Sequence, residues 1–381
     1  MPAGRSGARP RRARLSAFTP GRRGRYPGST HVRVLRWLRH PAVRERIASR
    51  IVGASRRAGA SPPDLLLVQR TALPVSHVKP FVEQATRLRV PLVVELDDDL
   101  FAKGVQDLDY GHHLDGLAVL LEASALTTVS TEVLRQAIVD RAPRVAVVPN
   151  MIDERLWLPR LRAAPRPPPP ADRATRLVYT GSVTHAEDLE LLRPALEHVR
   201  LTAGLDVELS VIGGEPRSSN RSWYRRIEVP RGCGHYPRFV RWLRTQRRRW
   251  DIAVAPLAAS AFNASKSDLK FLEYSALGLP GVYSDVPAFA TCEDGVTGLK
   301  AANTVEAWSK ALIRLCTEAT LRSRVREEAY RYVVSQRCLV HAAGDYAELL
   351  CGVLSGGERS HSAADRLAAV LLPARAGTGT G

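Results

Sequence analysis

The sequence predicts an α/β protein made of two Rossmann-like parallel-sheet domains that face each other across a cleft, with helices at the carboxyl terminus. The length of 381 residues is sufficient for two domains of ordinary size. Short apolar strands alternate with helices, as in parallel sheets covered on both faces. A stretch that contains Pro165 and Pro167–Pro170 interrupts this alternation, which then restarts. We therefore expect domains at residues 31–158 and 175–354, joined by a stiff linker at 159–174.

The amino-terminal domain is expected to begin near His31. Residues 1–30 hold eight arginines and no acidic residue, and they are expected to be a disordered tail. Apolar runs then predict strands at 65–68, 90–96, 127–129 and 145–148, and helices at 78–88, 114–124 and 132–139.

The carboxyl-terminal domain shows the same rhythm. It has predicted strands at 177–179, 207–212, 251–255 and 281–284. Helices are expected at 187–201, 236–246, 269–277, 305–316, 321–334 and 341–354. Within the helix at 236–246, Tyr236 and Phe239 are expected to pack in the core. Residues 355–381 are expected to be a loose tail.

The net charge of +18 comes from arginine, because six lysines among 56 basic residues leave 50 arginines. With abundant Ala, Gly and Pro, this composition is typical of GC-rich coding. No zinc-finger, RRM or helix-turn-helix pattern accompanies the charge, so no nucleic-acid partner is expected. An arginine-rich nucleic-acid binder remains the alternative, and its binding would be steeply salt-dependent. The charge also suits anionic ligands and an anionic membrane surface.

The five cysteines are scattered and include no C-x-x-C pair, which predicts a reduced, cytoplasmic protein without structural zinc. No apolar run is long enough to span a membrane, and the amino terminus lacks the apolar segment of a signal peptide. Any contact with a membrane is therefore expected to be peripheral, at the inner face.

The richest segment is Trp250–Asp285, which reads as strand, loop, polar corner, helix and strand. Lys266, Ser267 and Asp268 stand at the start of the helix, where free backbone N–H groups and the helix dipole favour an anion. Glu273 lies one turn further along as a fixed carboxylate. A phosphate site with a carboxylate for ribose hydroxyls is what a nucleotide diphosphate requires. The alternative is an ordinary capped helix, because Ser265 and Asp268 have capping-box spacing.

This segment resembles the donor site of GT-B glycosyltransferases of the family 4, or group 1, type, especially bacterial enzymes of cell-surface polysaccharide biosynthesis. The resemblance covers roughly residues 90–335 and is strongest at 176–190 and 250–285. The matching residues in the second region are Asp251, Ala255, Pro256, Leu257, Asn263, Lys266, Ser267, Asp268, Lys270, Glu273, Tyr274, Gly278, Pro280, Ser284 and Asp285.

The resemblance implies a retaining, metal-independent glycosyltransferase that moves a sugar from a nucleotide diphosphate to a glycan or lipid-linked acceptor. Glu273 would bind the ribose, and Lys266 and Lys270 would neutralise charge on the departing diphosphate. Ser267 and Asp268 would lie beside the donor. No cofactor is expected.

A second region, residues 176–190, resembles the opening of the second domain in the same family. The resemblance places Gly181, Ser182 and His185 against the donor phosphates. For His185, a simple polar role at the start of a helix is an equal alternative.

Three consecutive acids follow the strand at 90–96. Asp97 and Asp99 could hold a divalent metal ion on the nucleotide in a D-x-D arrangement. They could instead bind the acceptor or act as a catalytic base, which the resemblance favours. A turn cap with solvated neighbours is the structural alternative.

Two departures from the family pattern affect the prediction. Ser265 stands where the family places a glutamate, eight residues before the ribose-binding glutamate, so the contact to the donor sugar is missing or comes from Asp268. The first domain also looks short. These departures motivate a rival hypothesis, a non-catalytic GT-B-like partner of a polysaccharide assembly complex. Asn150 is expected to line the interdomain cleft or to serve as a turn residue.

Overall fold

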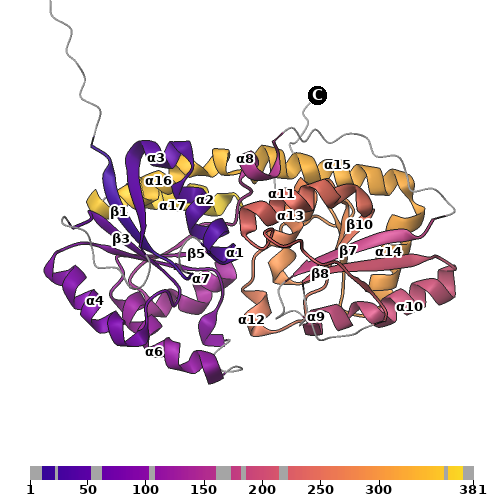
Figure 1. The fold of residues 1–381 in the computed structure, drawn as a ribbon, viewed down its shortest axis with the longest axis horizontal. Helices are drawn as coiled ribbons and strands as arrows, with labels where there is room; N and C mark the ends of the chain where they lie inside the picture. The colour runs from indigo at the N-terminus through magenta and orange to yellow at the C-terminus, as the bar shows by residue number, and fades with distance from the viewer. Residues whose placement is uncertain are drawn as a thin grey trace, which may run out of the picture.

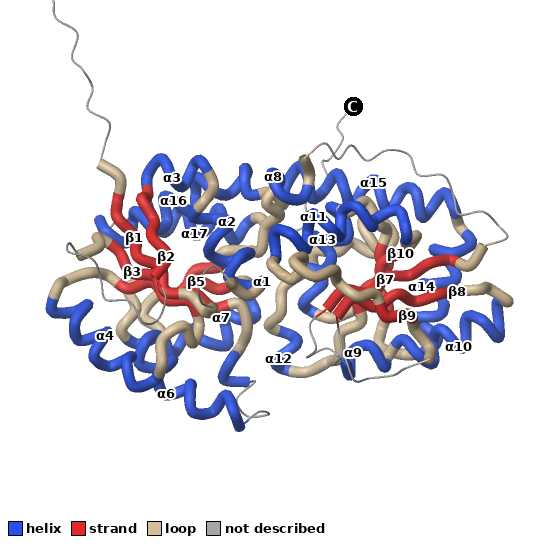
Figure 2. Tube along the Cα trace, in the orientation of Figure 1, coloured by secondary structure: helices blue, strands red, loops and turns tan. Residues whose placement is uncertain are grey.

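A computed structural model describes residues 11–21, 25–52, 62–102, 108–159, 173–181, 186–213, 222–355 and 359–371. Two α/β lobes lie side by side, each with a central sheet between layers of helices (Figure 1, Figure 2). Both sheets have six strands, where the sequence predicts four in each, and the strands of the described residues pair in parallel, as expected. Helices on both faces bury the strands, which explains their nearly continuous apolar sequences.

The amino-terminal sheet has the strand order β2-β1-β3-β4-β5-β6. Its strands are β1 (Ala13–Phe18), β2 (Ile47–Val52), β3 (Leu65–Gln69), β4 (Leu92–Leu96), β5 (Leu126–Val129) and β6 (Val145–Val147). Its helices are α1 (Gly28–Thr30), a π-helical turn (His31–Leu35), α2 (Arg36–Leu38), α3 (Pro41–Arg46), α4 (Val75–Arg87), α6 (Leu108–Glu122) and α7 (Glu132–Ile138). One face of the sheet packs against α4, α6 and α7, and the other packs against the α1–α3 segment.

The carboxyl-terminal sheet has the strand order β12-β11-β10-β7-β8-β9. Its strands are β7 (Thr175–Gly181), β8 (Val207–Gly213), β9 (Arg225–Arg226), β10 (Ile252–Ala255), β11 (Gly281–Ser284) and β12 (Leu299–Ala301). Its helices are α9 (Ala186–Glu190), α10 (Leu192–Ala203), α11 (Tyr236–Gln246), α12 (Ala261–Ala264), α13 (Leu269–Ala276), α14 (Val305–Thr317) and α15 (Ala319–Gln336). α10 and α14 cover one face, while α11 and α13 cover the other.

The chain crosses between the lobes twice, and the two crossings pair with each other. The backbone N–H of Ile152 donates to the Arg337 carbonyl at 2.8 Å, and the Leu339 N–H donates to the Ile152 carbonyl at 2.9 Å. The first crossing continues into α8 (Glu154–Trp157), which packs in the carboxyl-terminal lobe. The second leads back to the amino-terminal lobe through α16 (Leu339–Ser355) and α17 (Arg359–Ala369), the yellow helices beside the indigo lobe in Figure 1.

The prediction that residues 1–30 form a disordered tail is wrong for the part of this range that the structure describes. Ala13–Phe18 form β1, which pairs with both β2 and β3, and Leu15 and Ala17 are buried. The hydrogen bonds and the burial of this strand come from neighbours distant in sequence, and its arginine hid the strand pattern. The edge strand β2 was not predicted either. Residues 1–10 and 22–24 lie outside the described part.

The boundaries of the two domains also need correction. α16 was assigned to the carboxyl-terminal domain and residues 355–381 to a loose tail. Both α16 and α17 instead pack on the sheet of the amino-terminal lobe, with Ala363 and Leu367 buried. A Cβ on Gly352 would lie 2.4 Å from the Ser360 Cβ, so glycine permits the close contact between the two helices. The amino-terminal domain is therefore not short. The predicted linker falls mostly outside the described residues, since 160–172 are not among them.

Candidate donor-binding site

The segment between β10 and α13 is held in place by polar side chains of β11, α9 and α12. After β10, the Leu257 N–H donates to Ser284 Oγ at 2.8 Å. The next N–H, that of Ala258, donates to the Asp188 carboxylate at 2.7 Å. The Asn263 side chain in turn donates to the Ala258 carbonyl at 2.8 Å. These bonds fix the loop that leads to the polar corner. Three residues of the family pattern, Leu257, Asn263 and Ser284, take part in them.

Lys270 and Glu273 lie three residues apart on α13 and therefore share one side of the helix, with Lys266 in the preceding turn. The Lys266 Nζ lies 4.9 Å from the Phe262 ring centre, and the Lys270 Nζ lies 5.3 Å from that of Tyr179 at the end of β7. An oxygen of Glu273 accepts a hydrogen bond of 3.1 Å from the Tyr236 hydroxyl. The structure thus brings together Lys266, Lys270 and Glu273, three of the charged residues predicted to bind the donor.

The charges in this cluster perturb one another. Burial raises the pKa of Glu273 to about 7, although the Tyr236 hydrogen bond and Lys270 oppose the shift. Burial and the neighbouring Lys266 lower the pKa of Lys270 to about 8, against the attraction of Glu273 and Asp188. Lys270 and Glu273, whose pKa values are shifted, lie with Lys266 at the start of a helix and form a site suited to an anionic ligand with hydroxyl groups.

Asp268 and Ser267 have partners from the crossing segments. Both oxygens of Asp268 accept from the Arg337 guanidinium, at 2.6 and 3.0 Å, and Thr291 Oγ1 donates to one of them at 2.5 Å. Asn150 Nδ2 donates to Ser267 Oγ at 2.5 Å. Asp268 makes no side-chain cap to α13, so the capping-box alternative is wrong. The predicted donor contacts of Ser267 and Asp268 stay predictions. Asp268 would contact the donor while its carboxylate remains paired with Arg337.

The end of β7 lies against α13. The Tyr274 hydroxyl of α13 accepts from the Thr180 N–H at 2.9 Å and from Thr180 Oγ1 at 3.2 Å. At Gly181, an added Cβ would lie 2.6 Å from the Tyr179 hydroxyl, so the chain requires glycine there. Ser182 and His185 lie outside the described residues, and their donor contacts stay predictions.

The acidic turn of the amino-terminal lobe faces the polar corner. The Asp99 N–H donates to Ser265 Oγ at 3.4 Å, and Thr131 Oγ1 donates to the Ser265 carbonyl at 2.8 Å. Ser265, which replaces the family glutamate, is therefore a contact between the lobes.

The carboxylates of this turn already have partners. Arg70 forms ion pairs with Asp97 at 3.2 Å and with Asp98 at 2.8 Å. Asp99 caps the following turn by accepting from two backbone N–H groups, at 3.1 and 3.0 Å. Burial raises the pKa of Asp97 to about 7 against the attraction of Arg70. Among the described residues, no group of three or more His, Cys, Asp or Glu side chains is placed to hold a metal ion.

A buried network of polar side chains between the lobes was not predicted from the sequence. Arg33 lies in the segment at 32–38 that the sequence pattern left unassigned. Its guanidinium donates to Glu95 at 2.6 Å and to Asn150 Oδ1 at 2.9 Å. Arg337 donates to the Asn150 carbonyl at 3.0 Å. Nothing local in the sequence distinguishes these two arginines from the other 48.

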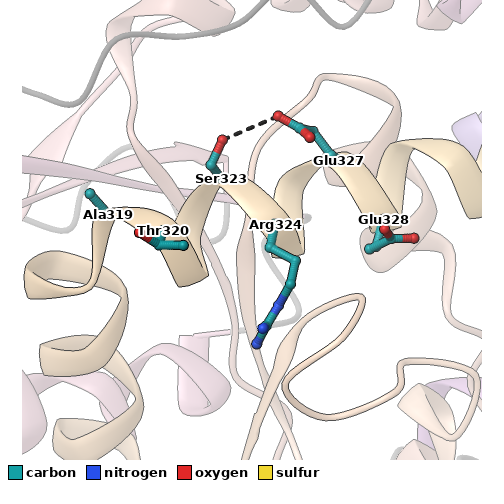
Figure 3. Close-up of a pocket in the computed structure, with 6 residues that line it drawn as sticks. All are labelled: Ala319, Thr320, Ser323, Arg324, Glu327 and Glu328. Carbon is teal, nitrogen blue, oxygen red and sulfur yellow. Dashed lines mark hydrogen bonds between the residues drawn. The ribbon is translucent and has the colours of Figure 1, made fainter.

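The hollow shown in Figure 3 lies on α15 and has a volume of about 490 Å³. It is lined by Ala319, Thr320, Ser323, Arg324, Glu327 and Glu328. A second hollow, of about 460 Å³, lies at the β1–β2 edge of the other sheet. Neither includes a residue of the predicted donor site.

Two parallel sheets in facing lobes, crossed twice by the chain, define a GT-B fold. Residues 174–318 match the family model described as Glycosyl transferases group 1. This match agrees with the resemblance found at residues 176–190 and 250–285.

Solved structures share this fold at low sequence identity. Sucrose-phosphate synthase from Thermosynechococcus elongatus is 13% identical with a TM-score of 0.62, and the match covers 91% of this chain and all of that one. HepE from Anabaena, in complex with UDP and glucose, is 12% identical with a TM-score of 0.61 over the same shares. A UDP-forming trehalose-phosphate synthase from Burkholderia xenovorans is 16% identical with a TM-score of 0.53, over 78% of this chain and 74% of that one. No curated protein matches the sequence significantly.

Proposed function

We propose that this protein is a retaining glycosyltransferase that transfers a sugar from a nucleotide diphosphate to a glycan or lipid-linked acceptor, without a metal ion. The observation that carries the proposal is the cluster of Lys266, Lys270 and Glu273 at the start of α13, within the group 1 domain. Retention, metal independence and a role in bacterial cell-surface polysaccharide biosynthesis are carried over from the family resemblance.

Each residue of the cluster has a role in the proposed reaction. Glu273 accepts hydrogen bonds from the ribose hydroxyls. Lys266 and Lys270 stabilise the negative charge that develops on the diphosphate as its bond to the anomeric carbon breaks. Gly181, Ser182 and His185 approach the phosphates from the loop after β7. Ser267 and Asp268 lie beside the donor and complete its binding site.

Asp97 and Asp99 are proposed to act on the acceptor side. The pKa of Asp97, raised by burial to about 7, suits a group that receives a proton from an acceptor hydroxyl near neutral pH. The metal-dependent alternative uses the same two carboxylates. Transfer activity that persists in excess chelator supports the metal-independent mechanism, and activity that is lost on chelation and restored by a divalent ion supports the alternative.

Calorimetric titration of nucleotide diphosphates tests the donor site. HepE was solved with UDP, so UDP is the first probe, followed by GDP and dTDP. Glu273→Ala is expected to weaken binding by about 1.5–3 kcal/mol, roughly tenfold to 150-fold, because it removes a charged hydrogen-bond acceptor. The exposed Glu208→Ala is the matched control and should bind as the wild type does. If no nucleotide binds the wild type at millimolar concentration, the assignment is wrong.

We also propose peripheral contact with an anionic membrane at its inner face, which would give access to a lipid-linked acceptor in the cytoplasm. No helix in the described part of the chain is long and apolar enough to cross a bilayer. α11 and the turn at Arg247–Arg249 contain six arginines and no acidic residue. Neighbouring arginines lower the pKa of Arg244, after the larger effect of its burial, so this surface is crowded with like charge that an anionic partner would relieve.

A further inference from the structure

The Tyr236 hydroxyl lies where the first crossing and the donor helix meet. It donates to Glu273 at 3.1 Å from the first residue of α11. The side chain of Trp157, from α8 in the first crossing, lies beside it. Core packing alone would need only the ring of Tyr236. The hydroxyl instead fixes one oxygen of the carboxylate predicted to bind ribose.

The ring of Tyr236 is in turn held by the other lobe. His31, in the π-helical turn of the amino-terminal lobe, stacks on it with ring centres 5.5 Å apart and an angle of 21°. His235 meets the same imidazole edge-on at 4.7 Å. His31 is 1% exposed, and neither ring nitrogen has a hydrogen-bond partner within the part of the chain that the structure describes. Burial lowers its pKa to about 4, with smaller electrostatic effects of His235, Arg36 and Arg39 in the same direction, so the ring of His31 is neutral at physiological pH.

A neutral histidine without partners contributes to this contact as a flat ring rather than as a charge or a donor. Glu273, by contrast, needs a fixed orientation, because Lys270 attracts its carboxylate from the same helix. The hydrogen bond from the Tyr236 hydroxyl keeps the Glu273 carboxylate from turning toward Lys270. It leaves the remaining lone pairs of the carboxylate available to a ligand.

We propose that Tyr236 is a positioning residue that orients Glu273 toward the ribose of the donor, and that His31 of the opposite lobe holds Tyr236 in place. This inference rests on the proposed function. Contact between the lobes and orientation of the ribose-binding carboxylate are then coupled through one aromatic stack.

Tyr236→Phe tests the hydroxyl while keeping the ring. UDP affinity at pH 7.5 is expected to fall roughly tenfold, since a hydrogen bond to a charged group is lost. Tyr346→Phe is the matched control, because it removes a buried hydroxyl that has no partner among the described residues. Wild-type affinity for UDP in Tyr236→Phe would overturn the proposal.

The pH dependence of UDP binding shows whether Tyr236 orients the Glu273 carboxylate or only packs against its neighbours. The titratable and charged groups around Glu273 and Tyr236 include Lys270 and Tyr274 on α13, Arg36 on α2, His31 in the π-helical turn and His235 before α11. Because the Tyr236 hydrogen bond favours the charged carboxylate, its loss raises the pKa of Glu273 further. The acid limb of UDP affinity is therefore expected to move to higher pH in Tyr236→Phe. A uniform loss at every pH would indicate packing alone and contradict the proposal.

Two substitutions of His31 test the stack. His31→Phe keeps a flat ring and removes two nitrogens without partners, so UDP affinity should stay within about twofold of the wild type. His31→Ala removes the ring and should lose affinity to the extent that Tyr236→Phe does. Loss in both variants would show that the imidazole nitrogens bind the ligand, which would overturn the role given to His31.

Failure of this inference can be distinguished from failure of the proposed function. If Glu273→Ala binds UDP as the wild type does, the donor site is wrong. If only Glu273→Ala loses affinity, the positioning role is wrong. Thermal unfolding tests the contact without nucleotide. The folded-state pKa of Glu273 lies above its ordinary value, so its stabilising contribution is lost as pH rises through about 7. The difference in melting temperature between wild type and Tyr236→Phe should be larger at pH 8.5 than at pH 5, and equal differences would contradict the contact.

Discussion

Glu273 and Lys270 have pKa values that burial moves toward each other. The carboxyl group rises to about 7 and the ammonium group falls to about 8. Burial disfavours the charged form of each group, and the opposite charge of the other group partly restores it. A nucleotide diphosphate needs both charged forms, since the ribose hydroxyls donate to a carboxylate and the phosphates attract an ammonium.

UDP affinity is therefore expected to be greatest between about pH 7 and pH 8. Below this window Glu273 becomes protonated, and above it Lys270 loses its proton. Calorimetric dissociation constants measured from pH 5.5 to 9.5 should show both limbs. Lys270→Arg should lose the alkaline limb, because a guanidinium stays charged. An affinity that changes in one direction over the whole range would contradict these roles.

Arg337 shows that a single residue can organise several elements. Its side chain is fully buried, yet it donates to Asp268 at the start of α13 and to the backbone of Asn150 in the first crossing. The attraction of Asp268 holds the pKa of the guanidinium above its ordinary value despite the cost of burial. The ion pair therefore joins the donor helix to both crossings.

At the scale of elements, Arg337→Ala is expected to lower the free energy of unfolding by about 3–5 kcal/mol, because Asp268 would remain as a buried charge without its partner. Urea unfolding followed by tryptophan fluorescence measures the loss. Arg314→Ala, which removes an exposed i,i+4 pair with Glu318, should cost less than about 0.5 kcal/mol. A loss below about 1 kcal/mol in Arg337→Ala would mean that the ion pair is not needed to hold the elements together.

At the scale of the whole molecule, hydrogen bonds between the lobes lie beside the predicted donor site. Asp99 and Thr131 of one lobe contact Ser265 of the other, and Asn150 contacts Ser267. The predicted donor site and the predicted acceptor-side acids are therefore adjacent only because the lobes are in contact. Figure 1 shows α11 on the upper side of this junction, while α4 lies at the lower edge of the other lobe.

The arginine surface of α11 predicts binding to anionic vesicles. The double variant Arg238→Glu and Arg241→Glu reverses two exposed charges and should weaken binding to phosphatidylglycerol vesicles at least tenfold, at about 1 kcal/mol per charge. The control, Lys79→Glu with Arg87→Glu on α4, changes the net charge equally and should have little effect. Sedimentation with vesicles at low and high salt measures both. Equal losses in the two variants would indicate net charge alone and refute a docking surface on α11.

Most elements of the fold could be predicted from the sequence because their patterns are local. α11 and β11 have the predicted bounds, and β10 and α13 begin or end within one residue of theirs. The predicted helix at 187–201 is divided between α9 and α10. β1 was missed because an arginine-containing strand becomes recognisable only when two parallel neighbours bury it. α17 was missed because it is buried only by packing with α16 on the amino-terminal lobe, and the sequence analysis assigned α16 to the carboxyl-terminal domain with α15.

The sequence by itself determined the alternation of strands and helices, the polar start of α13 and the types of residue that a nucleotide diphosphate would require. These are local properties, set by hydrophobic period and by the backbone groups that a helix start leaves free. Only the tertiary structure decided the partners of those residues. Arg337 pairs with Asp268, the acidic turn contacts Ser265 of the other lobe, and Tyr236 of α11 donates to Glu273 of α13. Burial and long-range contacts bring these groups together, and no spacing along the chain encodes which charge a buried side chain will meet.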